Sequence, residues 1–199
     1  MIAKPILLDL PMPILTPRLS IKPRHIGEGP ILNKAICGSL EHLKPWLPFA
    51  QSAPTLEESE EHCRRAYAQF ILRENFTLSI YTRDTQEFVG STGLHRPNWN
   101  VPAFEIGYWI CKEHENKGYV NESTNALTRY AFSVLRARRV EIRCDAKNNR
   151  SLNVMQRLGF TQEGILKNDS IQQTGELRDT LVTARYDLEG LPKLSVTWE

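Results

Sequence analysis

The sequence predicts an α/β fold in which helices cover a mixed, mostly antiparallel central sheet. Residues 76–82, 87–96 and 103–111 are rich in β-branched and aromatic side chains and are separated by turn-prone residues, which is typical of an antiparallel meander. Residues 119–138 and 139–146 then have the patterns of a helix and a strand. A meander followed by alternating helices and strands favours one mixed sheet packed against helices.

The segments before this meander contain the first predicted strand and several helices. Residues 19–24 alternate apolar and polar side chains, as a half-buried strand does. Residues 33–43 carry apolar side chains at helical spacing and should form short helices before two prolines interrupt the chain. Residues 54–75 predict a longer helix, because Thr55 precedes Glu58 by three positions, as in a capping box.

The C-terminal half continues the alternation of helix and strand. In residues 119–138, apolar side chains fall close to one helical face, at Val120, Leu127, Ala131 and Val134. Residues 149–160 form a short predicted helix that ends near Gly159, a common residue just after a helix. Residues 181–188 are a late predicted strand.

The composition is that of an ordinary globular protein, for which we expect one domain over residues 1–199. The chain is 41% hydrophobic and 24% charged, and its formal net charge of +2 gives no broad basic surface for nucleic acid. Prolines interrupt the N-terminal segment, so neither a signal peptide nor a membrane helix is expected there. The cysteines are scattered, which argues against disulfides and zinc sites. We expect a cytoplasmic protein with no membrane, nucleic-acid or metal partner.

The segment Glu-Asn-Lys-Gly-Tyr-Val, residues 115–120, lies where a predicted strand ends and a long helix begins. Glycine allows a tight turn and the close approach of a bulky anion, and a helix N-terminus leaves backbone N–H groups unpaired. The amides from Asn116 to Val120 can therefore cradle phosphates around Gly118, with the charge of Lys117 nearby. An ordinary strand-to-helix turn is the alternative.

Three further residues carry polar groups at positions where chemistry can occur. Asn148 and Ser151 stand at the entrance of the helix over residues 149–160, where they can cap the helix or face a cleft. Glu105 is an acidic residue in an otherwise apolar strand. Partial burial raises the pKa of a carboxyl group toward neutrality, which suits a general base. An edge position facing water is the alternative for Glu105.

These motifs, in this order, resemble the GNAT acetyltransferase superfamily. The closer resemblance is to its RimJ/RimL-like branch, which includes enzymes that acetylate the N-terminal amine of ribosomal proteins. Residues 15–24, 88–94 and 104–110 resemble the first, third and fourth strands of the family. Residues 115–120 resemble its pyrophosphate loop, and residues 148–160 resemble the N-x-x-S run that precedes L-G-F in this branch.

Two residues depart from the loop pattern of the family. Glu115 stands where Gln or Arg is usual, and Val120 stands where a second Gly or Ala is usual. A carboxylate near a pyrophosphate repels it unless the side chain points away. Backbone N–H donors do not depend on the side chain, so coenzyme A binding stays the favoured interpretation. A catalytically silent coenzyme A binding domain is the alternative.

The resemblance implies a direct transfer of an acetyl group from acetyl-CoA to a primary amine, without an acyl-enzyme. The coenzyme would pair with the backbone at Ile110 and Cys111, where the family's fourth strand separates from the fifth at a bulge. Glu105 would be the general base, with His95 as a second candidate, and the Ser151 hydroxyl would donate a hydrogen bond to the departing thiolate. The other coenzyme-binding residues implied are Asn116, Lys117, Gly118, Tyr119, Val120 and Asn148.

The resemblance also implies partners. The N-terminal amine of a protein, such as a ribosomal protein, is the first acceptor to consider. A small amine, an amino acid or an antibiotic fits the same chemistry, because the loops that bind acceptors carry no recognisable motif here. A homodimer is common in the family and is a further expectation.

Overall fold

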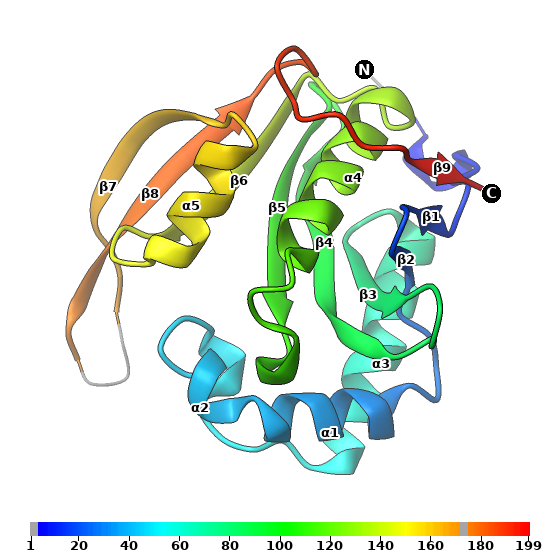
Figure 1. The fold of residues 1–199 in the computed structure, drawn as a ribbon, viewed down its shortest axis with the longest axis vertical. Coiled ribbons are helices and arrows are strands. Elements are labelled where there is room, and N and C mark those ends of the chain that lie inside the picture. Colours follow the sequence, from blue (N-terminus) through cyan, green and yellow to red (C-terminus); the bar gives the residue numbers. More distant parts are fainter. Residues whose placement is uncertain (1–3, 172–174) are drawn as a thin grey trace.

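The computed structural model describes residues 4–171 and 175–199, and its strands form one sheet (Figure 1). The described strands are β1 (Ile14–Leu15), β2 (Leu19–Pro23), β3 (Phe76–Thr82), β4 (Phe88–Asn98), β5 (Ala103–Ile110), β6 (Arg139–Asp145), β7 (Thr161–Ile171), β8 (Leu177–Arg185) and β9 (Thr197–Trp198). Their order in the sheet is β7-β8-β6-β5-β4-β3-β2-β1-β9. The pair of β5 and β6 is parallel and the other described pairs are antiparallel. The predicted mixed, mostly antiparallel α/β fold is therefore confirmed.

Helices cover this sheet. They are α1 (Gly29–Gly38), α2 (Leu40–Leu43), α3 (Leu56–Leu72), α4 (Tyr119–Ser133) and α5 (Asn149–Arg157), with short 3-10 turns η1 (Pro5–Leu7), η2 (Pro48–Ala50) and η3 (Lys112–His114). α4 packs against β1, β2, β4 and β5, whereas α3 packs against β3 and α1 packs against α3 and β4. Across residues 4–171 and 175–199, no helix has both the length and the apolar character needed to cross a membrane.

The predicted capping box at the start of α3 is confirmed. The Thr55 hydroxyl accepts the Glu58 N–H at 3.1 Å, and the Glu58 carboxylate accepts the Thr55 N–H at 2.7 Å. These bonds satisfy two donors that the start of a helix leaves unpaired. α3 then packs closely on α1 at Gly29, where a Cβ would lie 2.7 Å from the Glu60 Cα. A side chain at position 29 would therefore push the two helices apart.

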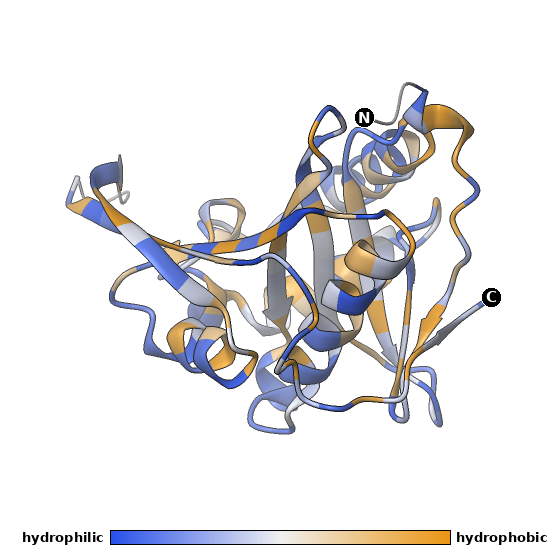
Figure 2. Ribbon diagram, turned by 90° about the horizontal axis from the view of Figure 1, so that it is seen from above, coloured by the Kyte–Doolittle hydropathy of each residue, from blue (hydrophilic) through white to orange (hydrophobic). Residues whose placement is uncertain are grey.

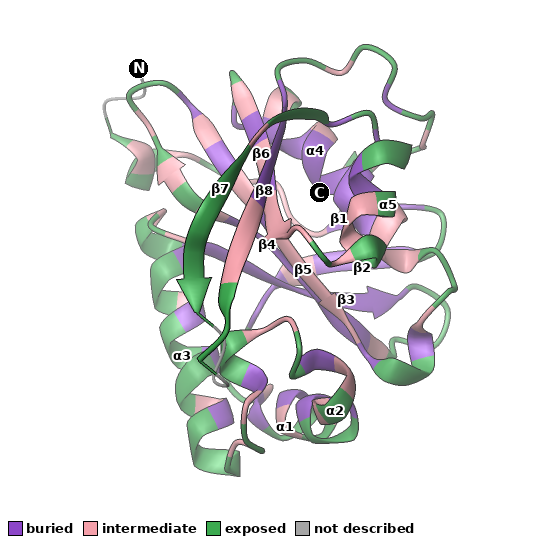
Figure 3. Ribbon diagram, turned by 90° about the vertical axis from the view of Figure 1, so that its left-hand side faces the viewer, coloured by how far each residue is buried: buried purple, intermediate pink, exposed green. Residues whose placement is uncertain are grey.

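Two hydrophobic clusters lie on opposite faces of the sheet. Ile110 of β5 packs in the larger cluster with α4, whereas the neighbouring Trp109 packs with Leu32 and Ile36 of α1. Because successive strand residues point to opposite faces, α4 and α1 must cover opposite faces of the sheet. Figure 3 shows that β3 is buried along its length, whereas β5 and β6 are mostly of intermediate exposure.

β5 and β6 pair over a short distance and then separate. Their parallel pairing runs from Ala103 and Arg139 to Glu105 and Glu141, after which β6 continues beside β8. Residues 106–110 of β5 therefore have no partner on the β6 side, although both strands are described in full. The centre of the sheet is open on one side of β5, as the family resemblance implies.

The sequence does not predict β7, which forms an edge of the sheet. β7 is exposed along nearly all of its length and pairs with β8 (Figure 3). Figure 2 shows the β7–β8 hairpin projecting from one side of the molecule, with hydrophilic and hydrophobic residues along it. A strand without a buried face lacks the alternating hydrophobic pattern on which strand prediction depends. The two-residue strands β1 and β9 also carry too little pattern to predict.

His95 of β4 occupies space that two glycines leave open. A Cβ at Gly93 would lie 2.8 Å from the His95 ring, and a Cβ at Gly107 would lie 2.9 Å from it. The Nδ1 atom of His95 lies 2.7 Å from the Asn75 Oδ1 atom. Burial lowers the pKa of His95 to about 4, and the nearby Arg96 adds to this decrease. His95 is therefore neutral near pH 7.

We expect the free energy of unfolding of the wild type to fall more steeply between pH 6.5 and about 4 than that of His95→Gln. The unfolded chain takes up a proton at His95 near pH 6.5 and the folded chain only near pH 4, so acid favours unfolding in this window. The difference corresponds to roughly 3 kcal/mol at the acid end. Urea unfolding across this window measures it, and parallel pH dependence of the two proteins would contradict the burial of a neutral imidazole.

Candidate active site

A cavity of about 590 Å³ lies where β5 and β6 separate. It is bordered by these two strands, by the first turns of α4 and α5, and by α2 and the residues that follow it. Eight of the ten predicted site residues line it: Glu105, Ile110, Asn116, Gly118, Tyr119, Val120, Asn148 and Ser151. The fold therefore gathers these residues, which are far apart in the sequence, around one space.

The backbone of Ile110 faces the open side of β5. The next residue, Cys111, donates its N–H to the Val89 carbonyl of β4 at 2.9 Å. Backbone groups alternate between the two sides of a strand, so the N–H and C=O groups of Ile110 point away from β4 and toward the gap. The β4–β5 ladder has no shift between Glu105 and Ile110, so the bulge expected at this end is absent from these two fully described strands.

The backbone of Cys111, unlike that of Ile110, is not available to pair with a coenzyme in this structure. Its N–H is bonded to Val89, and its carbonyl accepts the His114 N–H at 2.9 Å, so neither backbone group is free. Cys111 is buried and does not line the cavity. Burial also raises the pKa of its thiol to about 12, which opposes formation of a nucleophilic thiolate.

The N-terminus of α4 presents unpaired backbone N–H groups to the cavity. The first backbone bond of the helix runs from the Glu122 N–H to the Gly118 carbonyl at 3.1 Å, so the N–H groups of residues 119–121 have no helical carbonyl to bond. Gly118 has a φ of +79° and offers no capping side chain. Because these amides border the cavity, they are suited to bind an anion there.

Lys117 does not line the cavity, which differs from the sequence-based expectation. Its ammonium lies 3.2 Å from the His114 Nδ1 atom, and its carbonyl accepts a hydrogen bond from Arg18 at 2.9 Å. Arg18 also pairs with Glu122 in the first turn of α4 and lies over the Tyr119 ring. These contacts fix the loop to the start of α4 and hold the Lys117 ammonium beside His114.

Glu115, the acidic residue that departs from the loop pattern, lies among nitrogen-bearing side chains. Its carboxylate lies 2.6 Å from the Lys112 Nζ atom and 3.2 Å from the His42 Nδ1 atom, and it also contacts the Arg150 guanidinium of α5. The Glu115 side chain is only 11% exposed. The two cations offset the negative charge that would otherwise repel a phosphate at this end of the cavity.

Glu105 provides a partly buried carboxylate inside the cavity. Burial raises its pKa, and the neighbouring Glu141 carboxylate adds to the increase, while Arg96 and Arg143 oppose it. The Arg96 guanidinium lies 3.1 Å from the Oε2 atom of Glu105. No described residue donates a well-aligned hydrogen bond to this buried oxygen. A carboxylate in this state can accept a proton from a ligand in the cavity.

His95, the second candidate base, is less well placed than Glu105. It lies directly opposite Glu105 in the β4–β5 pair but does not line the cavity. Its Nδ1 atom is engaged with Asn75. The depressed pKa also makes the imidazole a weak base.

Asn148 and Ser151 meet at the start of α5. The Asn148 side-chain oxygen accepts the Ser151 N–H at 3.2 Å, so Asn148 caps the helix, which is one of the two roles considered for it. Both residues also line the cavity, together with Tyr108 of β5, which no motif in the sequence marks. Burial raises the pKa of Tyr108, and the nearby Ser151 hydroxyl opposes the increase. No described residue forms a well-oriented hydrogen bond with the buried Tyr108 hydroxyl, so a ligand in the cavity can meet it.

Two tryptophans in loops have different surroundings. Trp46, after α2, lines the cavity. Trp99 packs instead against Phe104, with ring centroids 5.3 Å apart, and donates its ring N–H to the Arg73 carbonyl at 3.1 Å. Arg150 also lines the cavity and was missed, since nothing in the sequence pairs it with Glu115.

Comparison with known protein families gives a match over most of the chain. The family described as acetyltransferase (GNAT) domain matches residues 28–161. A candidate ribosomal N-acetyltransferase of Bacillus subtilis (strain 168), YdaF, is 32% identical over 137 residues, which cover 67% of this chain and 72% of that protein. An uncharacterized N-acetyltransferase of Bacillus licheniformis, p20, is 31% identical over 101 residues. This second match covers 51% of the chain and only 56% of the relative.

A solved structure has the same fold. The ribosomal L7/L12 alpha-N-protein acetyltransferase RimL, in complex with coenzyme A, superposes with a TM-score of 0.81 at 22% identity. The match covers 87% of this chain and 96% of RimL.

Proposed function

Since the chain belongs to the GNAT acetyltransferase family, we propose that it transfers an acetyl group from acetyl-CoA to the N-terminal amine of a protein, with a ribosomal protein as the first candidate. Membership confirms the class of enzyme, an N-acetyltransferase, that the sequence predicts. One observation carries the proposal: the partly buried Glu105, the Ile110 backbone and the free amides of α4 all border one cavity.

The coenzyme would lie with its pyrophosphate at the start of α4. The N–H groups of residues 119–121 and the turn at Gly118 would hold the phosphates, because these donors have no helical partner. Its pantetheine arm would run along the open side of β5 and pair with the backbone of Ile110. RimL, which has the same fold, was solved with coenzyme A bound, which supports this assignment.

The acetyl transfer would be a direct attack by the amine on the thioester carbonyl. Glu105 would take a proton from the acceptor ammonium, directly or through water, because only the neutral amine has a lone pair to attack. A backbone N–H near Ile110, on the open side of β5, would stabilise the negative charge on the carbonyl oxygen of the tetrahedral intermediate. The C–S bond would then break, the nitrogen would lose a second proton as the acetamide forms, and the coenzyme thiolate would take up one proton.

A protein N-terminus as the acceptor is supported by the relatives. YdaF is a candidate ribosomal N-acetyltransferase, and RimL acetylates the α-amine of a ribosomal protein. A ribosomal acceptor would also place the reaction in the cytoplasm, the compartment expected from the sequence.

The proposal is tested by calorimetric titration with acetyl-CoA, followed by thiol release with peptides that carry ribosomal-protein N-termini. We expect binding, and we expect release only when the peptide N-terminus is free; the same peptides with a blocked N-terminus are the matched control. Binding without release from any peptide or small amine would favour a silent coenzyme-binding domain. Release from small amines alone would overturn the acceptor assignment.

Ser151→Ala is expected to lower kcat by roughly 10-fold while the dissociation constant of acetyl-CoA changes little. The serine hydroxyl would donate to the departing thiolate, and a hydrogen bond to a charged group contributes about 1.5–3 kcal/mol. Ser151→Thr keeps the hydroxyl and should retain most of the rate. Steady-state kinetics and calorimetry separate the two effects, and an unchanged kcat in Ser151→Ala would leave this residue with a structural role.

A further inference from the structure

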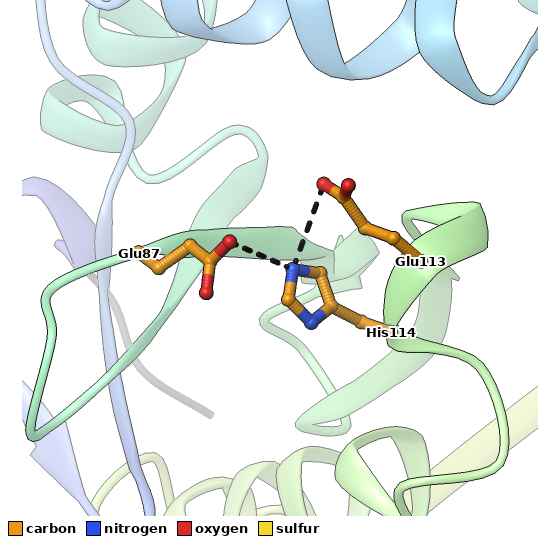
Figure 4. A group of neighbouring side chains, drawn as sticks. All are labelled: Glu87, Glu113 and His114. Atoms are coloured by element: carbon orange, nitrogen blue, oxygen red, sulfur yellow. Dashed lines mark ion pairs between the residues drawn. The ribbon is translucent and has the colours of Figure 1, made fainter.

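Three side chains without a role in the proposed mechanism converge beside the loop that precedes α4. Glu87 lies immediately before β4, and Glu113 and His114 belong to η3 (Figure 4). The His114 Nε2 atom lies 3.4 Å from a Glu87 carboxylate oxygen and 3.7 Å from a Glu113 carboxylate oxygen. One potential ligand atom from each residue lies within 4.8 Å of the others. Figure 4 shows both carboxylates directed toward the same ring nitrogen.

The ring nitrogen at the centre of this group is buried and lacks a hydrogen-bond partner. The His114 side chain is only 5% exposed, and no described group forms a hydrogen bond with Nε2. An unpaired buried polar atom costs about 1–3 kcal/mol. The Glu87 and Glu113 side chains are 53% and 75% exposed, so the group is open to solvent on the carboxylate side. A cation could therefore enter from solvent and reach the nitrogen.

The backbone holds these residues in place. The backbone carbonyl of Glu87 accepts a hydrogen bond from the Thr82 N–H at 2.9 Å, and the Glu87 N–H donates to the Thr82 hydroxyl at 3.1 Å. The His114 N–H donates a hydrogen bond to the Cys111 carbonyl at 2.9 Å, and the Cys111 N–H in turn donates to the Val89 carbonyl of β4. The backbone on both sides of the group is thus fixed to the β3–β4–β5 meander, so binding an ion would require ordering of the glutamate side chains only.

We propose that Glu87, Glu113 and His114 form a binding site for a divalent transition-metal ion, with Zn²⁺ as the best fit. Zn²⁺ binds imidazole nitrogen and carboxylate oxygen at about 2.0–2.2 Å in a tetrahedral arrangement, which places neighbouring ligand atoms ~3.4 Å apart. The separations of 3.4 and 3.7 Å are close to this value. Water would supply the fourth ligand. The imidazole disfavours Mg²⁺ and Ca²⁺, which take oxygen ligands.

Lys117 opposes this site and gives the proposal a sharp test. Its ammonium lies 3.2 Å from the His114 Nδ1 atom. A neutral imidazole that binds a metal through Nε2 carries its proton on Nδ1, and this nitrogen cannot then accept a hydrogen bond from the Lys117 ammonium. The lysine must turn away when the ion binds, and its charge also repels the ion. Removal of this charge should therefore strengthen binding.

The experiment is calorimetric titration of the full chain with Zn²⁺, repeated with Co²⁺ and its visible absorption as a report on coordination. We expect one ion per chain and a rise in the thermal midpoint with Zn²⁺. Loss of a residue that only hydrogen-bonds to a metal ligand weakens metal binding by ~10–100-fold. Glu87 and Glu113 are proposed as ligands themselves, so Glu87→Gln and Glu113→Gln should each weaken binding at least ~10-fold. Lys117→Met should tighten it. Glu61→Gln, on the exposed surface of α3, is the matched control and should bind as the wild type does.

Equal Zn²⁺ affinity in the wild type and in the Glu87→Gln/Glu113→Gln double variant would overturn the proposal, as would the absence of saturable binding. Absorption bands of a cobalt–thiolate bond would also overturn it, because they would place the ion at a cysteine. The two glutamates are exposed, so their variants should fold, and circular dichroism checks this. Acetyl-CoA titration of the same variants is read separately, so failure of the metal site does not affect the proposed function.

Discussion

Replacing Glu105 with glutamine is expected to lower kcat/KM by about 10²–10⁴-fold, the usual contribution of a general base. The dissociation constant of acetyl-CoA should stay nearly unchanged, because the change preserves shape and lies away from the amides of α4. The wild-type rate should rise with pH through the raised pKa of Glu105, since only the carboxylate can accept the proton. The variant should lack this part of the pH–rate profile, as measured by thiol release.

Arg96 provides the control for this assignment. Its guanidinium lowers the pKa of Glu105 against the effect of burial, so Arg96→Met should move the rise in rate to higher pH. The shift should be small because the Arg96 side chain is 69% exposed and solvent screens its charge. A pH–rate profile that is identical in the wild type and Glu105→Gln would exclude Glu105 as the base.

Gly118→Val is expected to weaken acetyl-CoA binding at least ~10-fold. The left-handed backbone conformation costs a residue with a side chain about 1–2 kcal/mol, so valine resists the turn that directs the α4 amides into the cavity. Gly118 has a φ of +79°, and a Cβ there would lie 3.4 Å from the Arg18 guanidinium that holds the loop. Calorimetric titration with acetyl-CoA measures the effect.

Gly190→Val separates the effect on the site from general backbone strain. Gly190 has a φ of +69° with no atom within 4 Å of its Cβ position, and it lies outside the cavity. This variant should lose stability in a similar way but keep its affinity for acetyl-CoA. If the two variants bound the coenzyme equally well while folded, the assignment of the phosphate site to Gly118 would fail.

The elements that the sequence predicts are those whose pattern is local. β3 matches the predicted residues 76–82, and the Thr55 cap fixes the start of α3, because hydrophobic content and capping depend on neighbours in the chain. β7 was missed, since an exposed edge strand is held by pairing with β8 and not by its own pattern. Glu105 and Gly118, which line the cavity, stand out in the sequence as an acidic residue in an apolar strand and a glycine before a helix.

The parts of the site that could not be predicted depend on register and on long-range contacts. Whether Ile110 or Cys111 faces the gap depends on which residue bonds to β4, and only the Val89 contact decides this. The group of Glu87 and His114 arises because the β4–β5 hairpin brings distant positions together. No spacing in the sequence reveals such contacts, and the expectation of no metal rests on the scattered cysteines.

The setting of Glu115 has a consequence for how a coenzyme approaches the protein. Its carboxylate pairs with Arg150, which lines the cavity, and with Lys112 beside it. Burial, Arg150 and Lys112 lower the pKa of His42 and keep its imidazole uncharged near pH 7. Glu115, Lys112 and Arg150 together carry a net charge of +1. An incoming polyphosphate is therefore attracted over several ångströms despite the acidic residue in the loop, and the strength of this steering decreases as salt is added.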